Sequence, residues 1–242
     1  RQEKTRAMQA IAEAAFPGDP SDEPLLFAAN PEFEQGVVGL VASRLTEQYY
    51  RPSVVVQMGE EESHGSCRSI PEFNITEALD ECAPLLERYG GHAAAAGFTV
   101  RNENIEELSE MLWGGAADHL AGLELLPRLD IDSELALCDA TTALADALRV
   151  LEPTGEANPA PLFCTRNAKV VNRFTVGQEG QHLKLALSDG QNELEAIAFR
   201  LGELVEHLPE RVDVAYRLEL DTWNGTRRLQ MHVEDIRPAE GA

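Results

Sequence analysis

The 242-residue sequence predicts an α/β domain followed by a small all-β barrel. Through residues 24–126, stretches whose apolar residues recur at helical spacing alternate with short runs rich in β-branched residues, an order that is typical of α/β domains. A proline-rich stretch at residues 152–161 ends this pattern. Beyond it, apolar and polar residues alternate, as they do in strands with one buried face. An Asn224-Gly225 pair between the last two runs favours a tight hairpin turn.

The first elements follow from periodicity and from helix-breaking residues. Residues 1–16 have helical spacing, and the prolines that come next end the helix. We predict a strand at 25–29 and a helix at 36–50. Residues 53–58 are predicted to form a buried strand, because β-branched residues dominate them.

The rest of the first domain is predicted to alternate in the same way. The predicted elements are, in order, a turn at 60–65, a strand at 66–70, a helix from a cap at Asn74 or Thr76 to about Arg88, a strand at 93–100 and a helix at 104–120. The Gly90-Gly91 pair is expected to stop the third helix of the chain.

The second half of the chain is predicted to be mostly strand. Residues 128–135 are expected to be extended and residues 139–151 helical, which makes this stretch a connecting segment. After the proline-rich loop, five strand-like runs are interrupted by one short helical run between the third and the fourth. That order suits a small Greek-key barrel of the OB type.

Composition limits the classes of protein that fit. The hydrophobic fraction is 43% and the charged fraction 26%, and no apolar run is long enough to span a membrane. The four scattered cysteines indicate small buried side chains in a reducing cytoplasm. The formal net charge of −22 argues against binding nucleic acid through the overall electrostatic field.

Within residues 164–184, however, the charge balance reverses. Arg166, Lys169, Arg173 and Lys184 are accompanied there by a single carboxylate, Glu179. A local basic strip on an acidic chain can still hold a nucleic-acid backbone. The acidic remainder is equally consistent with a solubility role or with halophilic adaptation.

Three glycine-containing motifs are candidates for binding phosphate. Tyr89–Gly97 (YGGHAAAAG) offers close backbone approach and a histidine donor, Gly65–Ser69 (GSCRS) offers hydroxyls and a guanidinium, and Gly36–Arg44 (GVVGLVASR) offers a glycine-rich helix start. Each also has a purely structural interpretation: a helix cap before a tight strand, a solvated strand end, and helix-packing glycines.

Basic residues and aromatic rings are interleaved on the predicted strands of the barrel. OB barrels bind single strands with this combination, although several of the rings must belong to the core. We expect Trp223 to be a stacking ring, because it adjoins the predicted hairpin turn. The predicted DNA-binding residues of the barrel are Arg166, Lys169, Arg173, Lys184, Arg200 and Trp223, and the other interleaved rings are Phe163, Phe174 and Phe199.

A metal site is not predicted. The sequence has no D-x-D, D-H-H or H-E-x-x-H motif, and His119, His182, His207 and His232 are isolated along the chain. Nothing in the pattern would by itself hold two divalent metals for phosphodiester hydrolysis.

Taken in order, the three glycine motifs resemble those of the DHHA1 domain of the RecJ exonucleases, in the DHH phosphoesterase superfamily. The opening RQEKTRAM resembles a long inter-domain helix of that family. Later motifs extend the resemblance through the barrel and so over nearly the whole chain: Glu152-Pro153 through Asn158-Pro159, His182-Leu183-Lys184, Ala196–Phe199 and Trp223-Asn224-Gly225. The resemblance divides the chain into the end of a connecting helix (1–23), a DHHA1-like α/β domain (24–126), a connecting segment (127–152) and an OB-like barrel (153–242).

The resemblance implies a substrate-binding role for this chain and catalysis elsewhere. The implied substrate-binding residues are Arg44, Ser66, Arg68, Ser69, Gly90, Gly91 and His92. His92 is also expected to assist catalysis, no other residue here is expected to be catalytic, and the chain itself is expected to bind no cofactor. One position departs from the family pattern: Glu34 stands where a histidine is expected.

The resemblance also implies what the whole protein does. Since the chain starts at Arg1 within a helical pattern, we expect a fragment whose missing DHH domain holds Mn²⁺ or Mg²⁺ and cuts single-stranded DNA from its 5′ end during recombination and repair. Single-stranded DNA is the expected ligand, a single-strand-binding protein or a helicase the expected partner, and the cytoplasm the expected location, with no membrane contact. Two alternatives stay open: an oligoribonucleotide or cyclic-dinucleotide phosphodiesterase, and a non-catalytic nucleic-acid- or protein-binding module.

Overall fold

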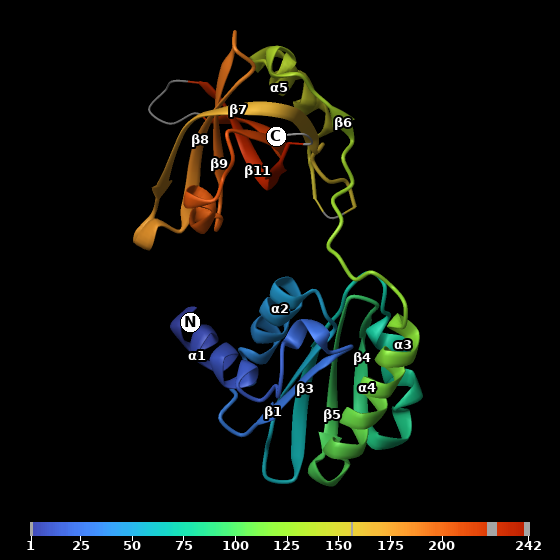
Figure 1. Cartoon of the computed structure of the whole chain (residues 1–242). Helices are drawn as coiled ribbons and strands as arrows, with labels where there is room; N and C mark the ends of the chain where they lie inside the picture. Colours follow the sequence, from blue (N-terminus) through green and yellow to red (C-terminus); the bar gives the residue numbers. More distant parts are fainter. Residues whose placement is uncertain (1, 156, 222–226, 240–242) are drawn as a thin grey trace. The chain divides into compact units, whose positions relative to one another are not determined.

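The computed structural model describes residues 2–155, 157–221 and 227–239 and divides the chain into two units, which meet between Pro127 and Arg128 (Figure 1). Each unit has its own hydrophobic core. Among the described residues, no helix is long and apolar enough to cross a membrane.

The first unit alternates helices and strands, as expected for an α/β domain. Its elements are α1 (Gln2–Glu13), η1 (Pro20–Asp22), β1 (Leu26–Asn30), α2 (Val38–Tyr49), β2 (Ser53–Gln57), β3 (Glu62–Arg68), α3 (Ile75–Glu81), η2 (Ala83–Leu85), β4 (Leu86–His92), β5 (Ala95–Arg101), η3 (Asn102–Asn104) and α4 (Ile105–Leu120).

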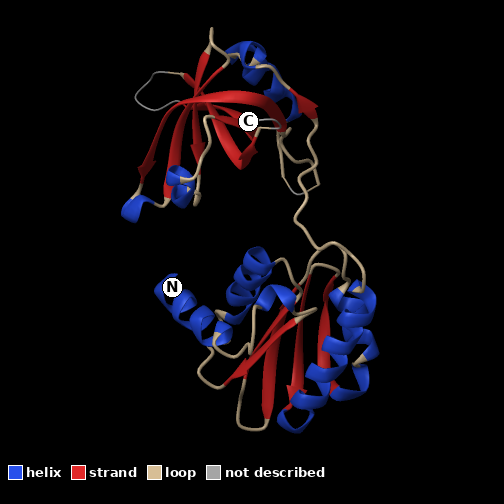
Figure 2. Ribbon diagram, in the orientation of Figure 1, coloured by secondary structure: helices blue, strands red, loops and turns tan. Residues whose placement is uncertain are grey.

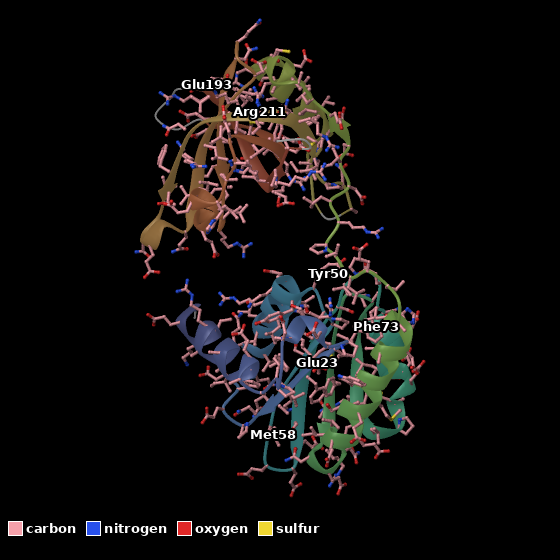
Figure 3. All side chains as sticks on the ribbon, in the orientation of Figure 1. Glu23, Tyr50, Met58, Phe73, Glu193 and Arg211 are labelled. Atoms are coloured by element: carbon pink, nitrogen blue, oxygen red, sulfur yellow. The ribbon has the colours of Figure 1, made fainter. Side chains whose placement is uncertain are left out.

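The strands of this unit form one sheet in the order β1-β2-β3-β5-β4, with β1 and β2 parallel and the other pairs antiparallel. Helices lie against both faces of the sheet (Figure 2). One core joins α1 and α2 to the face of β1 and β2 that carries Val55. A second core joins α3 and α4 to the opposite face, and Phe73, labelled in Figure 3, belongs to it. We call these sides of the sheet the α2 face and the α4 face.

Two predictions for this unit are wrong. Residues 60–65 were predicted as a turn, but β3 begins at Glu62. Its inward residues are small, because the ring of Phe98 fills the space where a Cβ on Gly65 would lie, 2.1 Å from the nearest ring atom. Because the inward residues are small and the outward ones polar, this segment lacks the alternation of large apolar and polar residues that predicts a strand.

The helix predicted to run to Arg88 ends instead at Glu81, and Gly90-Gly91 lies within strand β4. A register shift between Leu86 and Arg88 puts both Leu86 and Tyr89 toward the α4 face. This bulge creates a three-residue spacing of apolar side chains, which imitates the period of a helix.

The second unit contains the barrel. Its elements are β6 (Ser133–Glu134), η4 (Leu137–Asp139), α5 (Thr142–Leu148), η5 (Arg149–Leu151), β7 (Phe163–Val176), η6 (Gln178–Gly180), β8 (His182–Ser188), β9 (Glu193–Ala198), η7 (Gly202–Glu206), β10 (Arg211–Asp221) and β11 (Arg228–Pro238).

Strand order confirms the predicted fold class. The sheet runs β10-β11-β9-β8-β7-β6, and an additional β10–β7 pairing closes five of these strands into a barrel of the OB type. The β9–β11 pair is parallel, and the short helix η7 lies between the third and fourth barrel strands as predicted. The predicted Asn224-Gly225 turn lies outside the described residues.

The segment 127–152, which we predicted to connect the domains, contributes elements to the second unit from Arg128 onward. Strand β6 pairs with β7 through Ser133 and Glu134. Leu137 lies within the barrel core, and Leu148 of α5 packs against it. The stretch predicted to be extended thus contains β6, and the stretch predicted to be helical contains α5, and both pack on this unit.

Candidate nucleic-acid interfaces

The first candidate interface is an exposed part of the α2 face formed by β3, β5 and β4. Helix α2 covers β2 and part of β3, whereas strand β4 is exposed at the edge of the sheet along most of its length. Ser66 is the register partner of Val55, which places its side chain on the α2 face. We call the outward side of these three strands on the α2 face the open face.

Strand register brings four of the predicted site residues together there. Arg68, Ala95 and His92 form one row across the three strands. Ser66, Gly97 and Gly90 form the next row. Motifs that are more than 20 residues apart in the sequence therefore place a guanidinium, an imidazole and a hydroxyl on the same side of the sheet in two neighbouring rows. These groups are donors of the kind that bind a phosphate.

Helix α2 borders these rows. A Cβ atom on Gly39 would lie 3.2 Å from Ser66 Oγ and 3.4 Å from an Arg68 guanidinium nitrogen, so this glycine lets the helix start lie close against β3. No side chain caps the helix at Val37, but the Val37 and Val38 N–H groups donate to the Glu34 carbonyl oxygen at 2.8 and 3.2 Å, so backbone acceptors satisfy most of this helix start. Arg44 lies on the same helix, and no hydrogen bond joins it to the described residues of the open face.

The remaining first-domain predictions do not join this face. The Ser69 hydroxyl donates to the Phe73 carbonyl oxygen at 2.6 Å, so it stabilises the chain after β3. Gly91 faces the opposite way, and a Cβ there would lie 2.5 Å from Ala96 Cα. Its lack of a side chain is explained by strand packing.

In the basic strip predicted for the barrel, three of the four cations are paired with carboxylates from elsewhere in the unit. Arg166 pairs with Asp213 at 2.9 Å and with Glu134 at 3.0 Å. Lys169 pairs with Glu210 at 3.3 Å, and Lys184 with Glu195 at 3.5 Å. Arg173 donates to the Leu208 carbonyl oxygen. Local charge counting missed these partners, because tertiary contacts supply each of them.

Asp213 is the centre of the tightest of these ion pairs. The carboxylate is buried and accepts hydrogen bonds from the Asn167 N–H, Arg166 and Arg237. Burial by itself would raise the pKa of Asp213, but the Asn167 N–H and the two guanidinium groups outweigh it and hold that pKa below its ordinary value. This geometry indicates a structural role for Arg166.

The second candidate interface is the outward side of β7, β8, β9 and β11, which we call the aromatic face. Phe174, Lys184, Ile197 and His232 form a row in register across these strands. Phe199, just after β9, is 49% exposed.

Two histidines from distant strands surround the Phe199 ring. Its centroid lies 5.1 Å from that of His182 and 5.5 Å from that of His232, both in edge-on geometry. The His182 Nδ1 atom also accepts a hydrogen bond from the Arg200 N–H at 3.1 Å, which fixes the ring. The two histidines are isolated along the chain, and only strand register brings them together.

The other predicted barrel aromatics fall into different places. Phe163 is buried in the core beside Tyr216, at 6.3 Å between ring centroids. Phe174 is exposed on the aromatic face. Trp223 lies outside the described residues, so its predicted stacking role stays a prediction.

The fold and these surfaces define the class of protein. It is an α/β domain, with candidate phosphate-binding side chains on its open face, joined to an OB barrel. Residues 22–116 match the DHHA1 domain family, and residues 131–235 match the RecJ OB domain family. The chain belongs to the RecJ family and contains these two of its domains.

Individual relatives agree with this assignment. The chain is 30% identical to the single-stranded-DNA-specific exonuclease RecJ of Bacillus subtilis over 90% of this chain and 28% of that protein. It is 34% identical to the RecJ of Thermus thermophilus over 87% of this chain and 29% of that protein. The crystal structure of Thermus thermophilus RecJ in complex with Mn²⁺ superimposes with a TM-score of 0.79 and 30% identity, covering 99% of this chain and 34% of that chain. The chain therefore spans about a third of the length of these relatives.

Proposed function

We propose that this chain is the substrate-binding half of a 5′-to-3′ single-stranded-DNA exonuclease that acts in recombination and repair in the cytoplasm. The observation that carries the proposal is the convergence of Ser66, Arg68, Gly90 and His92 on one open face, in a chain that also contains an OB barrel. Relatives of this chain are named as single-stranded-DNA-specific exonucleases.

On the open face, the Arg68 guanidinium supplies charge and directed N–H donors to a phosphate. One of its nitrogens donates to the Cys67 carbonyl oxygen at 2.8 Å, which orients the group, and no described carboxylate pairs with it. His92 contributes a ring N–H in the same row, and as an assisting residue it would hold the phosphate beside the reacting bond. Ser66 contributes a hydroxyl in the next row.

On the aromatic face, we propose that Phe199 and Phe174 stack against unpaired bases. Every base has a π-face, so stacking on exposed rings binds single strands without regard to sequence. Since most of the barrel cations are already paired with carboxylates, stacking rather than charge would supply most of the affinity of this unit.

Hydrolysis itself is proposed to take place in a DHH domain outside this sequence, with Mn²⁺ or Mg²⁺. The described residues contain no group of three or more His, Cys, Asp or Glu side chains that could hold a metal ion, which is why the proposal places the metals in the DHH domain. The family resemblance supports a single-strand-binding protein or a helicase as partners of the whole protein.

The test is binding of a fluorescent single-stranded oligonucleotide by the chain, measured by anisotropy at low salt. We expect Arg68→Ala and Phe199→Ala each to weaken binding about tenfold, since a stacked base contributes about 1–3 kcal/mol and a charged hydrogen bond about 1.5–3 kcal/mol. Matched controls are Arg149→Ala, whose guanidinium pairs with Glu152, and Val150→Ala, whose residue is 86% exposed in η5, outside the strands that form the two faces.

Duplex DNA of the same length serves as the competitor. Binding that duplex DNA displaces as well as single-stranded DNA does would contradict the proposed substrate. Equal losses in the control variants would show that the two faces have no special role.

A further inference from the structure

A second pair of basic side chains lies on the open face, in a row that none of the glycine motifs predicted. His64 of β3 is the register partner of Thr99 of β5, and Thr99 is the partner of Arg88 of β4. Side chains two residues apart on a strand point to the same side. His64 and Arg88 therefore lie on the same side as Arg68 and His92.

The residues beside Arg88 support this orientation independently. Leu86 packs into the core of the α4 face. The Tyr89 hydroxyl is hydrogen-bonded to Asp80 of α3, on that same side of the sheet. Since Arg88 follows the bulge and precedes Tyr89, its side chain points the other way, to the open face.

In this third row, no described carboxylate pairs with the positive charge of Arg88. The chain has 42 acidic residues and 20 basic ones, yet Arg88 is exposed and makes no ion pair with a described carboxylate. The His64 Nδ1 atom lies 3.2 Å from Thr99 Oγ1, which orients the ring. One row further on, Arg101 pairs with Glu103 at 3.1 Å, so the cationic part of the face ends at the third row.

The spacing of the rows matches that of a nucleic-acid backbone. Consecutive rows are two residues apart, which is about 6.7 Å along a strand. This is close to the distance between neighbouring phosphates of an extended single strand. The outer rows, with Arg68 and Arg88, are then about 13 Å apart, and the middle row has the Ser66 hydroxyl and the open space at Gly90.

We propose that the open face binds three consecutive phosphates of one DNA strand, with His64 and Arg88 holding the phosphate at the end opposite to Arg68 and His92. This inference rests on the proposed function and narrows its substrate class. A ligand with one or two phosphates uses only the first two rows, so strands of three or more phosphates are preferred over dinucleotides.

The experiment measures binding of 5′-phosphorylated oligothymidylates of one to eight nucleotides to the 242-residue chain. For the wild type, we expect the affinity to rise up to three phosphates and then more slowly. Arg88→Ala should weaken binding about tenfold for the trimer and longer strands and leave the dimer unchanged. It should also make the slope of log K against log salt shallower by about 0.7, the contribution of one phosphate on a single strand. Arg68→Ala should weaken binding at every length.

Arg101→Ala is the matched control, because it removes the same charge from the same face at a position that Glu103 already neutralises. The three rows together form the proposed three-phosphate track. An equal loss of affinity in Arg88→Ala and Arg101→Ala would overturn this track, and so would a loss of affinity in Arg88→Ala that is the same at all strand lengths. Loss in Arg68→Ala with none in Arg88→Ala would overturn the track and leave the proposed function standing. No binding of any strand at low salt would overturn both. Thermal unfolding of each variant confirms that the fold is retained.

Discussion

At the residue scale, the partners of a charged side chain decide what it can do. Arg166 stands in a locally basic run, but its guanidinium is held by Asp213 and Glu134. Arg68 stands in a chain of strongly acidic composition, but no described carboxylate pairs with it. The first is therefore bound within the protein, while the second carries the binding of an external anion in the proposed function.

The Asp213 ion pairs predict a pH-dependent stability. We expect Asp213→Asn to lower the free energy of unfolding by about 2 kcal/mol at pH 7, because it removes charged hydrogen bonds from a buried site. The pKa of Asp213 is lowered by folding, so its stabilisation is present above about pH 4, the ordinary carboxyl range, and is lost as the pH falls through the lower folded value. Chemical denaturation at pH 7, 5 and 3 should show the gap between wild type and variant closing at pH 3.

Glu210→Gln is the control for this prediction, since its pair with Lys169 is exposed and should contribute less than about 1 kcal/mol. A gap for Asp213→Asn that is constant over the pH range would mean that the carboxylate is not the stabilising group.

The cysteines predict selective thiol reactivity. Burial raises the pKa of Cys67 to about 12 and that of Cys82 to about 11, and it also raises the pKa of Cys164. Cys138, which we predicted to be buried like the others, is exposed because it lies in a 3-10 turn on the surface. A thiol reagent at pH 8 should react rapidly with Cys138 alone in the folded chain and with all four cysteines in denaturant. Rapid reaction persisting in Cys138→Ser would contradict the model of three buried thiols.

At the element scale, the edge strand β4 carries much of the candidate site, and its two adjacent glycines serve different purposes. A Cβ on Gly90 would meet no atom within 4 Å, whereas one on Gly91 would meet Ala96. Gly90 lies on the open face, and Gly91 lies on the α4 face. The bulge that precedes them is what turns Arg88 to the open face.

Substitution of these glycines should separate folding from binding. We expect Gly91→Ala to destabilise the first unit, since its Cβ would lie under 3 Å from the Ala95 and Ala96 backbone. Gly90→Val should leave the melting temperature within about 2 °C and weaken DNA binding about tenfold, because the side chain fills the middle row of the track. Differential scanning calorimetry and anisotropy measure the two effects. Unchanged binding by Gly90→Val would exclude close approach of a ligand at this strand.

At the scale of the whole molecule, the positions of the cations explain how a strongly acidic chain could bind DNA as proposed. A net charge of −22 is unfavourable for nucleic-acid binding, but most basic side chains of the barrel are paired with carboxylates. On the open face, Arg68 and Arg88 make no ion pair with a described carboxylate. In the proposed function, the field of the acidic remainder would repel phosphates from the rest of the surface.

This arrangement predicts a weak dependence of binding on salt. Three phosphates on a single strand correspond to a slope of log K against log salt of about −2. The measurement is anisotropy with an eight-nucleotide strand between 25 and 200 mM salt. A slope steeper than about −4 would show that the paired cations of the barrel also contact phosphates and release their counterions. The basic strip would then bind the nucleic-acid backbone, as the sequence predicts.

Much of the fold could be predicted from local patterns. The order of elements, the two-part division and the OB barrel follow from the period of apolar residues and from prolines and glycines, which act over a few neighbouring residues. The exceptions are β3 and β4, where Gly65 makes room for a ring 33 residues away and a bulge imitates helical spacing. Local patterns cannot report a packing partner or a register shift.

The sequence by itself determined the fold class, the glycine motifs and the family resemblance, because these depend on residue types at short spacing. Only the tertiary structure decided which residues act together. Strand register placed Arg88 and His64 beside the predicted phosphate residues, gathered His182, Phe199 and His232, and paired the barrel cations with distant carboxylates. The physical reason is that hydrogen-bonded pairing between strands sets which side chains are neighbours, and that pairing joins residues far apart in the chain.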